Sequence, residues 1–332
     1  VASKEMHTRG KTTLKFWRKS YTVELRDSFT FAGPNSTKEM DHFYLISMSL
    51  DRYYYHNELA FRCLAKVGLF PLWYHLTELK INGQSEGLYL IVQRPADFVL
   101  KDLGSSAIIR RSSTEFIAKE KYSKQTSEDI RKICRDHFHD IRKSGKRWEG
   151  EILYDSLQSY LVLDHYFSWL NFNYLVQNGD YTDELFYYLM PSVTPVRFDI
   201  IPWDFDDILV KNPHEGAEVR KSRLSDQLLF SSEDALDLII ARDPYLYKKY
   251  LENFDFVLDH LNPGAMENIF NEIKDDLRPY LEKEEIVLAS QHDYHPVENW
   301  KEASAHMGRI LNFLKKRWSE TRTEVKKQLR RS

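Results

Sequence analysis

The sequence predicts an α+β protein with two lobes. Strand-like patterns dominate its first third, and helix-like patterns dominate the rest. Two short strand candidates interrupt the helical part, directly after its most apolar helix. Strands followed by helices are typical of the α+β class, and ligands often bind in the cleft between two lobes. We expect a β-rich lobe over 1–125 and a mainly helical lobe over 126–332.

The first elements follow from local patterns. Ser20 to Leu25 alternates polar and apolar residues, as a half-buried strand does. Between Asp51 and Gly68 the apolar residues recur on one helical face, and Gly68 is suited to end a helix. Trp73 to Ile81 and Leu88 to Gln93 flank Asn82-Gly83, a dipeptide typical of hairpin turns.

The next elements lead into the second lobe. We expect a short strand at Ala107 to Ile109 and a charged, solvated helix or connecting segment from about 126 to 148. Apolar residues occupy nearly every face of Tyr160 to Val176, which indicates a helix at the centre of a lobe. The strand candidates Glu184 to Met190 and Pro195 to Ile201 follow this helix.

The chain is expected to be helical from about Ser225 to its end, and its last helix is basic. We interpret those basic residues as a solvated face, because apolar residues share the helix at core spacing. Over the whole chain, 47 Lys and Arg oppose 50 Asp and Glu, for a net charge of −3. A general attraction to nucleic acid or to acidic membranes is therefore not expected.

Two further features limit the location of the protein. Cys63 and Cys134 are the 2 cysteines, and they form neither a disulfide framework nor a zinc-binding pattern. A reducing, cytoplasmic compartment is the simplest interpretation. The first ten residues lack an apolar signal segment, and no stretch approaches the roughly 18 apolar residues of a membrane span. We therefore expect no association with a membrane.

Glycine is scarce in this chain. There are 12 glycines, whereas average usage predicts about 23 in a chain of 332 residues. No two glycines lie closer than Gly83 and Gly87, which excludes both a G-x-G-x-x-G loop and a Walker A loop. Any bound phosphate must therefore be held by side chains instead of a glycine-rich backbone.

Two acidic segments are the strongest candidates for chemistry. The first runs from Asn178 to Glu184, and the second from Asp204 to Asp207. Each follows an apolar element, where a fold can present side chains to a cleft. Because isolated carboxylates are costly to desolvate, the pattern suggests a shared cation such as Mg²⁺, which binds one or two carboxylates plus phosphate oxygens. The alternative is that these aspartates form turns and helix N-caps.

Four segments carry a family resemblance. The first is Arg9-Gly-Lys-Thr-Thr-Leu-Lys-Phe-Trp-Arg-Lys19-Ser-Tyr21, similar to the pattern R-G-x-S-S-x-x-F-x-K-K-S-Y. The others are His56-Asn57, Asn82-Gly-x-x-Glu86-Gly-Leu-Tyr-Leu90 and Ile201-Pro-Trp-Asp-Phe-Asp206. Together, over roughly residues 9 to 210, they resemble the CotH kinase family, the spore-coat-type atypical protein kinases.

The resemblance implies a bilobal atypical protein-kinase-like fold and an ATP-dependent, Mg- or Mn-dependent phosphotransferase acting on protein Ser or Thr hydroxyls. Asp180 falls on the family's catalytic aspartate, in an N-x-D-G-x-x-x-N segment, and Asp204 on a metal-binding aspartate. Such an aspartate accepts the hydroxyl proton while the cation neutralises phosphate charge. Arg9 and Lys19 match basic residues expected to bind the ATP phosphates.

Other positions complete or depart from this pattern. Asp206 and Glu184 are further candidate metal ligands, with Glu184 nearest to the asparagine that kinases use. Tyr181 stands where the family has glycine, and Gln93 where it often has glutamate. Arg110-Arg111 follows the strand expected at Ala107 to Ile109; either it faces the cleft, where Arg111 would bind the cofactor, or it is an exposed strand end.

These departures leave two alternative functions open. One is a nucleotide-binding pseudokinase that acts as an assembly or binding protein, suggested by Tyr181 and by the missing asparagine. The other is a kinase whose acceptor is a small-molecule hydroxyl. A protein substrate is the expected partner of the leading hypothesis, and the sequence carries no trace of the acceptor or of the oligomeric state.

Overall fold

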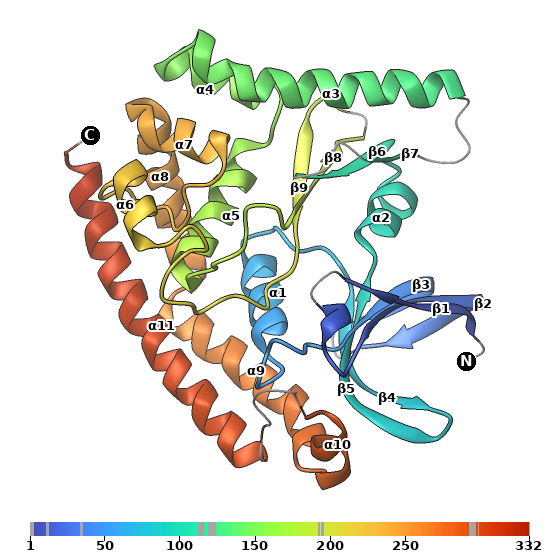
Figure 1. The fold of residues 1–332 in the computed structure, drawn as a ribbon. Coiled ribbons are helices and arrows are strands. Elements are labelled where there is room, and N and C mark those ends of the chain that lie inside the picture. The colour runs from blue at the N-terminus through green and yellow to red at the C-terminus, as the bar shows by residue number, and fades with distance from the viewer. Residues whose placement is uncertain are drawn as a thin grey trace. The chain divides into compact units, whose positions relative to one another are not determined.

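Strands fill the N-terminal part of the chain and helices most of the remainder, which confirms the predicted α+β class (Figure 1). The computed structural model describes residues 3–10, 13–33, 36–111, 116–118, 124–191, 193, 196–291, 297 and 299–331. The chain divides into two compact units, each made of separate segments. The first comprises Val1–Ala60, Pro71–Phe98 and Glu267–Asn312, and the second Phe61–Phe70, Val99–Met266 and Phe313–Ser332. The predicted boundary at residue 125 stays a prediction.

The first unit contains an antiparallel sheet with the strand order β1-β2-β3-β5-β4. Its strands are β1 (Ser3–Arg9), β2 (Ser20–Ala32), β3 (Thr37–Ile46), β4 (Tyr74–Ile81) and β5 (Gln84–Gln93). The predicted hairpin is confirmed, because β4 and β5 pair on either side of Asn82-Gly83. The strand predicted at Ser20 is also confirmed, as the first half of a longer β2.

The helices that belong wholly or partly to the first unit are short or lie at its sequence boundaries. They are α1 (His56–Lys66), α2 (Pro95–Asp97), α9 (Pro263–Leu281), α10 (Glu284–Ala289) and α11 (Trp300–Leu329), besides the 3₁₀ turn η1 (Thr13–Lys15). The predicted stop of α1 at Gly68 is confirmed: Leu69 N donates to Leu64 O and Gly68 N to Ala65 O, the pair of bonds that closes a Schellman motif.

The second unit contains a second antiparallel sheet, with the order β7-β6-β8-β9. Its elements are β6 (Ala107–Arg110), β7 (Phe116–Ala118), β8 (Leu185–Leu189), β9 (Phe198–Pro202), the π-helix η2 (Phe98–Asp102) and the helices α3 (Lys124–Arg147), α4 (Gly150–Gln158), α5 (Leu163–Val176), α6 (Ala217–Leu224), α7 (Ala235–Arg242) and α8 (Pro244–His260). The predicted strands after the apolar helix are therefore confirmed, although Pro195 lies outside the described residues.

Helix α5 forms the core of the second unit. It packs against both α8 and strand β9, and residues on nearly all of its faces are buried. This confirms the prediction of a central helix, because a helix that is apolar all round must be enclosed on every side. The end of α5 is therefore a rigid place from which to present functional groups. No helix among the described residues combines the length and the apolar character that a bilayer span requires.

Candidate functional site

The first acidic segment begins where α5 ends. Gln177 ends the helix in the left-handed conformation, with φ 52°. Asn178 follows and is buried; its Nδ2 donates to Asn173 Oδ1 at 3.1 Å, and its Oδ1 accepts from Asp180 N at 3.3 Å. The asparagine side chain thus replaces the backbone bonds that the helix no longer provides. These bonds fix the backbone that carries Asp180.

The backbone of this segment pairs with the second acidic segment. Gly179 N donates to Asp207 O at 2.9 Å, and Val210 N donates to Gln177 O at 3.2 Å. A Cβ atom at position 179 would lie 2.5 Å from Asp207 Oδ2 and 2.8 Å from Val210 Cγ2, so any larger residue here would displace these two side chains. The structure therefore brings the two acidic segments side by side.

The second acidic segment is anchored by its aromatic residues. Trp203 and Phe205 are buried, and the Phe205 ring meets the Phe172 ring of α5 nearly at right angles, with centroids 5.9 Å apart. Asp204, between them, has φ 51°, a conformation that non-glycine residues seldom adopt. Asp204 and Asp206 are half-buried, unlike the two aromatic side chains. The aromatic residues hold the backbone of the second acidic segment in place.

Burial, and then mutual repulsion, raises the pKa values of the clustered carboxyls. Burial raises the pKa of Asp206 well above its usual range, and Asp204 and Asp207 raise it further. Burial, followed by Asp204, raises the pKa of Glu184 to about 8. The pKa of Asp180 is also raised, again chiefly by burial. Several carboxyls that cannot all ionise cheaply in one place are a feature of functional sites, and a cation would relieve the repulsion.

Glu184 supplies the clearest test of whether a cation fits. Its Oε1 accepts from Arg110 Nη2, and Arg110 Nε donates to Asp183 O at 2.9 Å. The other oxygen, Glu184 Oε2, is buried and has no hydrogen-bond partner in the part of the chain that the structure describes. Within the described ranges, no three side chains converge closely enough to enclose a metal alone. The unpartnered Oε2 is a ligand atom of the kind that Mg²⁺ accepts, and an ion held by so few carboxylates would complete its shell with water and phosphate oxygens.

His214 joins the two acidic segments and was missed by the sequence reasoning. Its Nε2 lies 2.9 Å from Asp207 Oδ2, and its Nδ1 lies 3.5 Å from Asp180 Oδ1. The only local signal is that Pro213 and Gly216 bracket it with the spacing of a turn, a few residues after the second acidic segment.

Tyr181, at the family's glycine position, lies in the core. Its hydroxyl accepts from Ser231 N at 3.1 Å and donates to Ser231 O at 3.3 Å. The Tyr181 ring also meets the Trp169 ring edge-on, with centroids 5.2 Å apart. Tyr181 is almost fully buried, whereas the Asp180 side chain is 42% exposed. The aromatic substitution at this position therefore fills the interior and leaves Asp180 accessible.

Arg111 is buried, so the interpretation of this position as an exposed strand end is wrong. Its Nη2 lies 2.7 Å from Asp234 Oδ1 and 3.1 Å from Asp237 Oδ1. Burial alone would lower the pKa of Arg111, but Asp237 and Asp234 outweigh it and raise the pKa. Asp234 also caps α7, accepting from Leu236 N. The role of Arg111 in cofactor binding stays a prediction.

The predicted phosphate ligands Arg9 and Lys19 belong to the first unit, and the acidic residues to the second. Lys19 Nζ donates to Leu14 O at 2.7 Å and also to Phe16 O, so it closes the turn that contains η1. Arg9 ends β1 and lies 3.9 Å from the centroid of the Tyr44 ring. Their roles in phosphate binding stay predictions.

Arg18, next to Lys19 in sequence, is structural. It is buried, and its guanidinium donates to Ser47 O at 3.0 Å, to Ser290 O at 3.3 Å and to Leu88 O. Its partners lie far apart in the sequence, so no local pattern marks this role. Arg18 and Lys19 are thus neighbouring cations that both donate to backbone carbonyls of the first unit, and Arg18 is the buried one.

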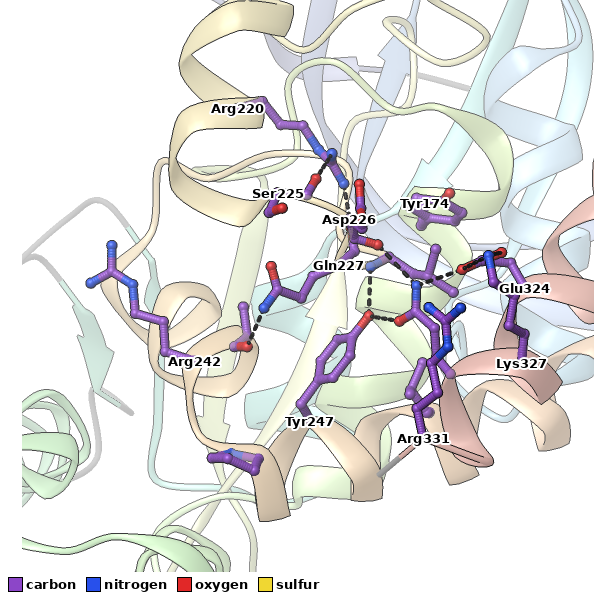
Figure 2. Close-up of a pocket in the computed structure, with 15 residues that line it drawn as sticks. Tyr174, Arg220, Ser225, Asp226, Gln227, Arg242, Tyr247, Glu324, Lys327 and Arg331 are labelled. Carbon is purple, nitrogen blue, oxygen red and sulfur yellow. Dashed lines mark hydrogen bonds and ion pairs between the residues drawn. The ribbon is translucent and has the colours of Figure 1, made fainter.

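A pocket elsewhere in the second unit does not contain the acidic cluster. It has a volume of 760 Å³ and is lined by residues from the end of α5, from α6 to α8 and from the end of α11. The hydroxyl of Tyr247, a residue labelled in Figure 2, accepts from Leu228 N at 2.8 Å and donates to Gln328 Oε1 at 2.7 Å. Arg220 bonds backbone carbonyls of the same loop, including Ser225 O at 2.9 Å. These groups serve mainly to hold the loop after α6.

Comparisons with known proteins identify the family of the chain. The family described as CotH kinase protein matches residues 6–320, which confirms the resemblance. Among solved structures, the chain is similar to that of a Helicobacter pylori proinflammatory kinase, CtkA. The two share 12% identity, over 95% of this chain and 96% of that chain, with a TM-score of 0.40. No curated protein matches the chain.

Proposed function

Since the chain belongs to the CotH kinase family, we propose that it is an ATP-dependent phosphotransferase that uses Mg²⁺ or Mn²⁺ and phosphorylates Ser or Thr hydroxyls of a protein. The observation that carries this proposal is the joining of two acidic segments by backbone hydrogen bonds, with Asp180 on one and Asp204 on the other. The perturbed pKa values of neighbouring carboxyls support it.

In this proposal Asp180 is the catalytic base. The acceptor hydroxyl oxygen forms a bond to the γ-phosphorus, the bond from that phosphorus to the bridging oxygen breaks, ADP leaves, and Asp180 takes the hydroxyl proton. The 42% exposure of the Asp180 side chain allows an acceptor to reach it. A base with a raised pKa is better matched to neutral pH than an ordinary aspartate is.

Asp204, Asp206 and Glu184 are the proposed ligands of the cation. When bound, the cation would neutralise charge on the transferred phosphoryl group. The unpartnered Oε2 of Glu184 supports this assignment, because a buried acceptor without a donor is costly. Lys19 and Arg9 are the proposed phosphate ligands. The Lys19 ammonium carries three donors, so a phosphate can share it with the carbonyls of Leu14 and Phe16.

Transfer from radiolabelled ATP tests the proposal. We expect incorporation of label with Mg²⁺ or Mn²⁺, into the protein itself or a general protein acceptor. Asp180→Asn should lower kcat by about 100-fold or more while ATP still binds. Asp204→Asn should weaken nucleotide binding in the presence of the cation. Asp226→Asn, at an exposed aspartate of the same unit, is the matched control. Absence of nucleotide binding by calorimetry with either cation would refute the proposal.

A nucleotide-binding protein without transfer activity is the second candidate. One observation favours it: Glu184, the residue nearest to the expected asparagine, is paired with Arg110 through one of its two carboxylate oxygens. This pairing competes with a cation for that oxygen. Autophosphorylation by the parent protein would rule out this candidate, whereas nucleotide binding without label transfer to any protein or small-molecule hydroxyl would favour it.

A further inference from the structure

We propose that His214 is a positioning residue for Asp180. The inference rests on the proposed function for its activity measurements and on the structure for its geometry. The two ring nitrogens of His214 face two different carboxylates, Asp180 Oδ1 at 3.5 Å and Asp207 Oδ2 at 2.9 Å. One imidazole therefore connects the proposed base to the second acidic segment.

The loop that carries His214 is held from both sides. Gly216 N donates to Pro213 O at 2.9 Å and has φ 86°, so residues 213–216 form a tight turn that ends in glycine. Glu215, directly after His214, accepts from Ser231 Oγ at 3.0 Å and from Ser232 Oγ at 2.9 Å. The turn thus directs two adjacent side chains to different partners: Glu215 contacts the two serines, and His214 lies beside the two carboxylates.

The backbone reinforces the side-chain contacts. His214 N donates to Gly179 O at 3.3 Å, and Gly179 N donates to Asp207 O at 2.9 Å. The backbone of Gly179 is thus bonded both to His214 and to Asp207, the residue whose carboxylate lies beside the His214 ring. Asp180, directly after Gly179, donates through its backbone N to Asn178 Oδ1, and its carboxylate lies 3.5 Å from His214 Nδ1.

The contact has a chemical consequence for Asp180. Nearby carboxylates repel its negative charge, and the imidazole that lies 3.5 Å from its Oδ1 limits the orientations open to the carboxylate. Deletion of the imidazole leaves that orientation unspecified and leaves Asp180 beside Asp207 without a group between them. We therefore expect the loss in the transfer step and not in nucleotide binding, which involves other residues.

The experiment compares four variants of the full chain. His214→Ala should lower kcat by about 10-fold to 100-fold, with KM for ATP within about twofold of the parent. Because the His214 side chain is 52% exposed, added imidazole can reach the vacated space and should restore part of kcat. The amide of His214→Asn reaches the position of Nδ1 and that of His214→Gln the position of Nε2, so the Asn variant should retain more kcat. His139→Ala removes an exposed histidine of α3 and should match the parent.

Parent activity in His214→Ala would overturn the proposal, as would a loss that imidazole does not restore or that appears equally as a rise in KM. If the parent transfers no label, the proposed function fails, and hydrogen exchange then decides this inference separately. His214→Ala should speed hydrogen exchange by about threefold or more at two backbone amides, that of Gly179 and that of position 214. His139→Ala should leave both rates unchanged. Unchanged exchange would count against the positioning role.

Discussion

Replacement of Tyr181 by phenylalanine tests whether this residue serves the core or the reaction. The change removes one oxygen atom, which accepts from Ser231 N at 3.1 Å and donates to Ser231 O at 3.3 Å. Ser231 is fully buried, so its N–H and C=O would lose this partner without access to water. An unpaired buried group costs about 1–3 kcal/mol, and both bonds are long, so we expect a loss of about 2 kcal/mol.

For a unit of this size, about 2 kcal/mol corresponds to a fall in Tm of about 5 °C, measurable by calorimetry or by circular dichroism. The ring stays in place against Trp169, so kcat for phosphoryl transfer should change by less than about twofold. Tyr245→Phe, at a half-buried tyrosine of the same unit, is the control. An unchanged Tm would show that the bonds to Ser231 do not form. A tenfold loss of kcat in a folded variant would show that Tyr181 takes part in the reaction.

Three other perturbations have defined outcomes. Because burial raises the pKa of Glu184 from 4.5 to about 8, protons and cations compete for its carboxylate, and Mn²⁺ affinity should rise from about pH 6 to about pH 9. Without a cation, the free energy of unfolding should fall as the pH rises from 4.5 to about 8, and both effects should be weaker in Glu184→Gln. Gly179→Ala places a Cβ 2.5 Å from a carboxylate oxygen, so it should cost about 1–3 kcal/mol and most of the activity, whereas Gly308→Ala, whose Cβ meets nothing within 4 Å, should stabilise by about 0.5–1 kcal/mol, both read from denaturant unfolding. Arg111→Met leaves buried Asp237 without its cation and should cost about 3–5 kcal/mol in the same assay; a loss under 1 kcal/mol would contradict the pairing.

Local patterns predicted the elements whose burial is uniform or alternates. Helix α5 is apolar on every face and occupies the core, and the β4–β5 hairpin follows from its Asn-Gly turn. Strands β1 and β3 were missed. The residues of β1 are nearly all exposed, and β3 begins with charged residues, so neither shows the alternation of a half-buried strand. Both are strands because they pair with β2 over a long register, a non-local cause.

The candidate site was also only partly predictable from the sequence. Its acidic residues were predicted from the sequence because clustered carboxylates after apolar elements are unusual. The structure brings the two acidic segments together. His214 and Arg18 were missed because their meaning depends on distant partners. The Arg18 guanidinium donates to the carbonyl oxygens of Ser47 and Ser290, which no spacing rule in the sequence connects to it. The part played by Tyr181 likewise depends on Ser231, 50 residues away.

The location of a bound cation tests the central claim most directly. Crystals of the full chain grown with Mn²⁺ and a non-hydrolysable ATP analogue would give an anomalous difference peak for manganese. We predict this peak within coordination distance of Asp204, with a phosphate oxygen of the analogue as a shared ligand and Glu184 or Asp206 beside it. A bound analogue whose manganese lies away from all three carboxylates would contradict the account.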